Sequence, residues 1–152
     1  MPTPLITTAR TARLDLPHLF PGQAQKEAFV NEALARLDTL VQAAVIDERA
    51  NPPADPAPGD CYIVGDAPTG AWSGHANAIA GWAENQWLFA TPGEGWRAFD
   101  RSAGSVACYR GAAGWVRATA PALPTGGNAP DAEARAALSA VIASLKELGI
   151  FA

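Results

Sequence analysis

Proline clusters divide this sequence into parts that cannot belong to one continuous helix or sheet. Residues 51–59 hold four prolines in nine positions, and residues 119–130 hold three prolines and two glycines. Proline lacks a backbone donor, so it disrupts helix interiors and central strands. We therefore expect two extended linkers, over 51–59 and 119–130, that separate a β-rich centre from a helix on each side.

The stretch before the first linker predicts an oligomerisation helix over residues 22–50. It has no proline or glycine from Gln23 to Ala50, and its apolar residues are spaced four, three, four and three apart. This spacing places them on one narrow seam. The seam either packs on the chain's own domain or bundles with copies of itself, and its residues are Val30, Leu34, Leu37, Val41 and Ala44.

Residues 60–118 predict a small antiparallel β domain. Short runs of β-branched and aromatic residues alternate with glycine-containing breaks, and the expected strands are 60–65, 78–83, 86–90, 96–100, 106–110 and 115–117. Glu84 and Asn85 form a two-residue hairpin turn, and Gly114 can adopt a positive φ in the last turn. Strands joined by such short turns indicate an antiparallel meander.

The last segment, 131–152, predicts a second oligomerisation helix. Asn128 is a candidate N-cap and Gly149 a candidate C-terminal stop. Its seam repeats the spacing of the first, and its residues are Ala134, Leu138, Val141, Leu145 and Leu148. The linker over 119–130 separates this helix from the β domain, so little of the same chain can cover its apolar strip. An uncovered strip favours self-association. The expected fold is α+β, with helical bundling of several copies.

Residues 1–21 are rich in proline, threonine and leucine, with no helical period. We interpret them as an extended arm, which needs a surface to lie on. Its apolar residues are the candidates for docking on a larger assembly. They are Leu5, Leu14, Leu16, Leu19 and Phe20.

The net charge, the first residues and the cysteines limit the binding partners and the cellular location that we expect. The formal net charge is −4 and the pI is about 5.0, which disfavours nucleic-acid binding and gives no reason for a membrane partner. The first residues lack the apolar run of a signal peptide, so we expect synthesis in the cytoplasm. Cys61 and Cys108 are the only cysteines. They either pair or serve as small core residues.

A search for catalytic chemistry gives no strong candidate. The only histidines are His18 and His75, and no serine has the spacing of a nucleophile elbow. Two cysteines and two histidines do not form a zinc pattern, and no phosphate loop, dinucleotide fingerprint or calcium loop is present. Asp60 reads as a turn acceptor. We expect no enzyme activity, no metal and no cofactor.

Five tryptophans concentrate in the β domain. Aromatic faces stack on sugar rings, although small β domains also use tryptophan as core filler. Trp82 and Trp87 flank the predicted hairpin and favour core packing. Trp72 lies between Gly70 and Gly74 in a predicted loop, so it is the candidate for exposure and for binding a cell-surface polysaccharide.

Several motifs together resemble an uncharacterised family of alphaproteobacterial prophage and gene-transfer-agent proteins. They are LDLP at 14–17, QAQKE at 23–27, NEAL at 31–34, YIV at 62–64, TGAW at 69–72 and AGW at 80–82. The resemblance covers residues 14–118. It implies a virion structural protein, a tail-fibre or spike subunit, that is homotrimeric and contacts baseplate, tail or head proteins. The alternative is a carbohydrate-binding module, or a head-spike adaptor without a structural fibre role.

Overall fold

The computed structural model describes residues 10–19, 26–127 and 131–151. Over these residues it is an α+β protein with two α-helices, two short 3-10 helices and eight strands. In chain order these are α1 (Lys26–Leu40), β1 (Ala44–Val45), β2 (Glu48–Arg49), β3 (Cys61–Val64), η1 (Gly70–Trp72), β4 (Ile79–Ala83), β5 (Gln86–Ala90), β6 (Arg97–Asp100), β7 (Ser105–Tyr109), η2 (Gly111–Ala113), β8 (Trp115–Arg117) and α2 (Ala132–Glu147).

The six strands expected after residue 60 are confirmed, each to within one residue at either end. Glu84 and Asn85 both have positive φ angles, 48° and 59°, as the predicted two-residue hairpin between β4 and β5 requires. Gly114 has a φ of 67° in the turn before β8. These turn residues determine the register of the strands that they join.

The strands form two sheets rather than a single antiparallel meander. Their orders are β1-β6-β7-β8 and β2-β3-β4-β5, and the edge strands β1 and β2 pair in parallel with β6 and β3. The prediction of a helix over 22–50 is therefore wrong after Leu40. Gln42 has a φ of 48°, which ends the helix, and Val45 is fully buried between the sheets. Long-range pairing here outweighs a sequence that is locally compatible with a helix.

Because β1 and β2 precede the proline-rich segment 51–59, that segment is a loop inside the β domain and not a boundary before it. It contains no helix or strand, and it is held at its end by Gly59 N, which donates to Trp82 O over 2.9 Å. Asp60 is the turn acceptor expected, because its carboxylate accepts from Ala57 N at 2.9 Å.

Two larger apolar clusters stabilise the domain, and a third, smaller one joins Ala35 of α1 to Leu88 of β5. One of the larger clusters lies between the sheets and includes Val45, Cys61, Ile63, Ala98 and Ala107. The other covers the opposite face of sheet β2-β3-β4-β5 and includes Tyr62, Val64 and Trp72. Both cysteines are free thiols, Cys61 buried in the first cluster and Cys108 partly exposed.

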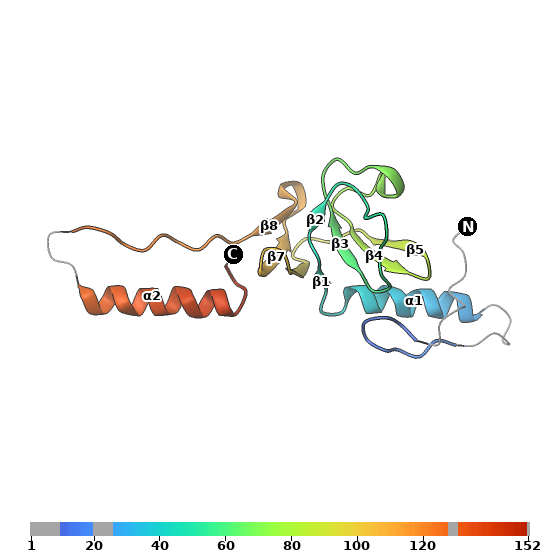
Figure 1. Ribbon diagram of the computed structural model, residues 1–152, viewed down its shortest axis with the longest axis horizontal. Helices are drawn as coiled ribbons and strands as arrows, with labels where there is room; N and C mark the ends of the chain where they lie inside the picture. Colours follow the sequence, from blue (N-terminus) through green and yellow to red (C-terminus); the bar gives the residue numbers. More distant parts are fainter. Residues whose placement is uncertain (1–9, 20–25, 128–130, 152) are drawn as a thin grey trace.

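Helix α2 lies apart from the β domain. In Figure 1 it projects from one end of the molecule, antiparallel to the extended segment that follows β8. Asp131 is its N-cap, accepting from Ala134 N at 2.8 Å, so Asn128 is not; Asn128 itself lies outside the described residues. Gly149, with a φ of 68°, ends the helix as expected. Gly149 N donates to Lys146 O, and Ile150 N donates to Leu145 O.

The residues after α2 return the chain to the β domain. Val106 N donates to Gly149 O over 2.7 Å, and Phe151 bridges Ala118 in parallel. These contacts attach the residues after α2 to β7 and to the residue that follows β8.

Candidate functional site

The apolar strip of α2 is a candidate surface for assembly. No residue of α2 is buried by the part of the chain that the structure describes. Leu138, Val141 and Leu148 are 49%, 55% and 71% exposed, and Leu145 is half-buried. A soluble helix ordinarily buries one apolar face. The strip therefore has the composition of a buried surface but lies open in the single chain.

The predicted seam of α1 is also largely open. Val30 and Leu37 are exposed and Leu34 is half-buried. Val41 is exposed in the turn after the helix, while Ala44 belongs to β1, so these two residues are not on the helix. The seam of α1 is thus shorter than the sequence spacing indicated.

The buried face of α1 is mostly polar. Its buried residues are Asn31, Ala35, Asp38 and Thr39. The Asn31 side chain accepts from Leu19 N at 2.9 Å and donates to Leu19 O at 3.0 Å. Asp38 accepts from Thr11 Oγ1 at 2.8 Å, from Arg13 N at 2.9 Å and from Leu14 N. This face holds the N-terminal segment through hydrogen bonds.

Residues 10–19 consequently form a docked loop and not the extended arm that was predicted. Arg10 and Pro17 bridge in antiparallel fashion, and Thr11 N donates to Leu16 O over 2.9 Å. The Arg13 guanidinium donates to the carbonyls of Asp38, Thr39 and Gln42 at 2.6–3.0 Å. Because these carbonyls end α1, Arg13 serves as a side-chain cap for the helix.

The apolar residues predicted to dock on a larger assembly differ in their exposure. Leu14 and Leu19 are exposed, and Leu16 is half-buried. Leu5 and Phe20 lie outside the described residues. Leu14 and Leu19 therefore present apolar side chains from a loop whose backbone is held in place.

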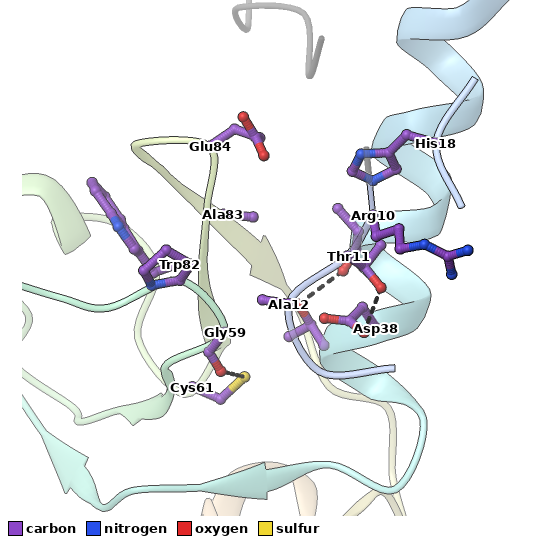
Figure 2. Close-up of a pocket in the computed structure, with 13 residues that line it drawn as sticks. Arg10, Thr11, Ala12, His18, Asp38, Gly59, Cys61, Trp82, Ala83 and Glu84 are labelled. Carbon is purple, nitrogen blue, oxygen red and sulfur yellow. Dashed lines mark hydrogen bonds between the residues drawn. The ribbon is translucent and has the colours of Figure 1, made fainter. Parts of the chain in front are cut away.

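A pocket of about 180 Å³ lies between this loop, α1 and the β4–β5 hairpin. In Figure 2, His18 and Glu84 lie at one end of the pocket and Gly59 and Cys61 at the other. Burial raises the pKa of the Cys61 thiol to about 11, with smaller contributions from nearby carboxylates. The thiol is therefore protonated at neutral pH and donates to Gly59 O at 3.5 Å. Asp38, which also lines the pocket, is occupied by the loop's own donors.

Comparison with known proteins assigns a family to this arrangement. Residues 30–116 match the model of a family described as a protein of unknown function, DUF2793, over more than half of the chain. The chain belongs to the DUF2793 family. No curated protein and no solved structure matches it.

The DUF2793 match begins within α1 and ends in β8, so it covers both sheets and excludes the docked loop, the extended segment and α2. The exposed strip of α2 thus lies outside the family region. The seam of α1 and the aromatic residues of the β domain lie inside it.

Within the DUF2793 region, Trp72 does not have the exposure predicted for it. Its side chain is fully buried, with the ring 5.0 Å from that of Trp87 and 5.6 Å from that of Tyr62. Trp72 ends η1, whose single turn folds the loop back onto sheet β2-β3-β4-β5. A buried ring cannot stack on a sugar, so the glycan-binding assignment of Trp72 is wrong.

Other aromatic residues reach the surface of the DUF2793 region instead. Trp82 and Trp87 are half-buried, with ring centroids 4.9 Å apart on adjacent strands. His75 is exposed, as expected, and stacks on half-buried Phe89 with centroids 3.7 Å apart. Strand alternation places Trp82, Trp87 and Phe89 on the same face of the sheet.

Among residues 10–19, 26–127 and 131–151, no group of three or more histidine, cysteine or acidic side chains could hold a metal ion. No described helix has the length and apolar character needed to cross a bilayer.

The polar face of α1 is the part of the site that sequence analysis missed. Apolar periodicity pointed to Val30 and Leu37, whereas the docked loop uses Asn31 and Asp38. A signal was present, because Asn31 and Asp38 are seven residues apart and so return to nearly the same side of a helix.

Proposed function

We propose that this protein is a structural subunit of a phage-like particle, a tail-fibre or spike protein that works by assembling and not by catalysis. It is made in the bacterial cytoplasm and functions in the virion. The number of copies proposed, three, and the partners, which are baseplate, tail or head proteins, come from the resemblance to prophage and gene-transfer-agent proteins.

The observation that carries this proposal is the open apolar strip of α2. Fully burying one aliphatic side chain contributes roughly 1.5–3 kcal/mol, so a strip of four such residues favours contact with another surface. An isolated helix of 16 residues is only marginally stable in water. Association of α2 with copies of itself stabilises the helix and covers the strip, as in a helical bundle.

Light scattering of the purified chain tests the self-association. We expect an oligomer for the complete chain and a monomer for a chain lacking residues 128–152. Val141→Asp is the sharper variant, because it places a charge on the exposed strip without removing a core residue. Ser139→Asp is the matched control, since Ser139 is exposed on the same helix and outside the seam.

The protein attaches to the particle through Leu14 and Leu19 in this proposal, because both side chains are exposed on the docked loop. Deleting the whole segment would uncover Asn31 and Asp38, so a substitution is the better test. Leu14→Ser with Leu19→Ser leaves the loop's hydrogen bonds intact, and we expect folded protein that is not incorporated into particles. Normal incorporation of this variant would argue against docking through the loop.

The second candidate is a carbohydrate-binding role in host-surface recognition. It is favoured by the half-exposed rings of Trp82, Trp87 and Phe89 on one face of the sheet, because such rings stack on sugars. Calorimetric titration with host polysaccharide tests it. We expect Trp82→Ala to reduce binding while circular dichroism reports an intact fold, whereas equal binding by both proteins would remove this candidate.

A further inference from the structure

The outward face of sheet β1-β6-β7-β8 is open and, apart from Arg97 on β6, apolar along its paired strands. Along β6, Ala98 and Asp100 point inward and are buried, whereas Arg97 and Phe99 are exposed. Strand register extends the outward row across the sheet, because Phe99 pairs with Ala44 and Val106, and Cys108 pairs with Val116. Phe99 is 40% and Val116 44% exposed. Sheets usually cover such a face.

This sheet face is continuous with the strip of α2. A Cβ built on Gly149 would lie 2.8 Å from Cε2 of Phe99, so the turn that ends α2 rests directly on the Phe99 ring. The residues on either side of that turn, Leu148 and Ile150, are both exposed. The strip of α2 therefore ends where the sheet face begins.

We infer that the outward face of sheet β1-β6-β7-β8 is part of the contact between copies of this chain and extends the contact made by α2. The inference rests on the proposed self-association and names a second surface for it. The occupant is a second copy, positioned by its own α2.

The geometry of helix packing places that copy at the sheet. Packed helices lie about 8–10 Å apart, axis to axis. In the proposed three-copy assembly with cyclic symmetry, neighbouring α2 helices run parallel. A second α2 lying parallel along this strip brings its own C-terminal turn, and the sheet attached to that turn, to within about one helix diameter of Phe99. The neighbouring β domain then stands against the outward face.

The small area of the α2 strip also indicates that the contact between copies includes the sheet face. A helix of 16 residues is about 24 Å long and about 10 Å wide, so it offers a strip of roughly 240 Å² in projection. Stable interfaces bury about 800 Å² on each partner. The strip of α2 falls short of this area, and the adjoining sheet face adds the apolar side chains of Phe99 and Val116, with Arg97 exposed on the same face.

Sedimentation equilibrium on four proteins tests the inference: the unaltered chain, Val116→Lys, Val141→Asp and Ala71→Lys. Ala71 is exposed in η1, which packs on the other sheet through Trp72, and it serves as the control for an added charge. We expect Val141→Asp and Val116→Lys each to raise the dissociation constant at least tenfold, and Ala71→Lys to leave it unchanged.

The outcomes separate this inference from the proposed function. If Val141→Asp dissociates the oligomer while Val116→Lys behaves as the unaltered chain, the sheet face is not in the contact and self-association through α2 stands. An unaltered chain that is monomeric at all concentrations overturns both.

The native thiol Cys108 supplies a measurement that does not depend on the folding of Val116→Lys. Cys108 lies on the outward face and is partly exposed, whereas Cys61 is buried. We expect a thiol reagent to label Cys108 more slowly in the unaltered oligomer than in Val141→Asp, with peptide mass spectrometry locating the label. Equal labelling rates in the two proteins would mean that the face stays open in the oligomer.

Discussion

At Gly81, only a hydrogen atom fits between β4 and α1. A Cβ built at this position would lie 2.6 Å from Oγ1 and 2.8 Å from Cγ2 of Thr39. Thr39 is itself buried and its hydroxyl donates to Ala35 O at 3.0 Å, so its side chain cannot easily turn away. The absence of a side chain at one strand position thus sets how closely the helix approaches the sheet.

We predict that Gly81→Ala lowers the free energy of unfolding by about 1–3 kcal/mol, the usual cost of overpacking a core. Chemical denaturation measures this change. The double variant Gly81→Ala with Thr39→Ala removes the clashing atoms and should recover part of the loss, so the two effects are not additive. Strict additivity would contradict the contact described.

At the scale of elements, the docked loop and α1 depend on each other. The loop supplies Arg13, which caps the end of the helix, and the helix supplies Asp38, which accepts hydrogen bonds from three groups of the loop. None of these hydrogen bonds involves a residue of a β-strand, so the loop can detach from α1 while α1 and the two sheets remain folded.

Asp38→Ala removes the acceptor that holds the loop. We expect a loss of stability of about 1–3 kcal/mol, because buried donors are left without a partner. Hydrogen exchange should show faster exchange at the amides of Arg13 and Leu14, with the β-strand amides unchanged. The control is Glu32→Ala, which removes an exposed ion pair with Arg36 and should change stability by no more than about 0.5 kcal/mol. Unaltered exchange at Leu14 in Asp38→Ala would show that the loop is held by other contacts.

At the scale of the whole molecule, a charged group links the two sheets. Arg117 on β8 donates to Asp100 Oδ2 on β6 at 2.8 Å and to Glu48 Oε2 on β2 at 2.9 Å. Burial acts to raise the pKa of Asp100, but hydrogen bonds from Ser102, Ala103 and Arg117 outweigh it, so the pKa lies below its usual value. Burial lowers the Arg117 pKa, yet Glu48 and Asp100 together raise it above its usual value.

This linkage predicts the direction of the pH dependence of stability. A carboxyl group whose pKa is lowered by folding stabilises the protein above the unfolded value, about 3.9, and the stabilisation is lost as the pH falls through the folded value. Thermal unfolding below pH 5 should therefore show a falling melting temperature. The melting temperature of Asp100→Asn should be lower than that of the unaltered protein at neutral pH, and it should depend less on pH below pH 5. A parallel decline in both proteins would assign the effect to other carboxylates.

The local sequence alone determined many of the strands, turns and helix ends of this protein. Strand positions after residue 60, the hairpin at Glu84 and Asn85, the ion pair of Glu32 with Arg36 and the stop of α2 at Gly149 all follow from side chains acting on their own neighbourhood. Such features are predictable because turn φ angles, helix caps and strand alternation depend on a few adjacent residues.

The tertiary structure decided the features that depend on distant partners. Ala44 and Val45 became a strand because β6, more than fifty residues later, offers a parallel edge. Trp72 lies in the core because its turn folds onto Tyr62 and Trp87. The loop around Arg13 docks on α1 because Asp38 faces it. In each case the free energy comes from burial or hydrogen bonds between segments far apart in the chain, and no local pattern encodes which segments will meet.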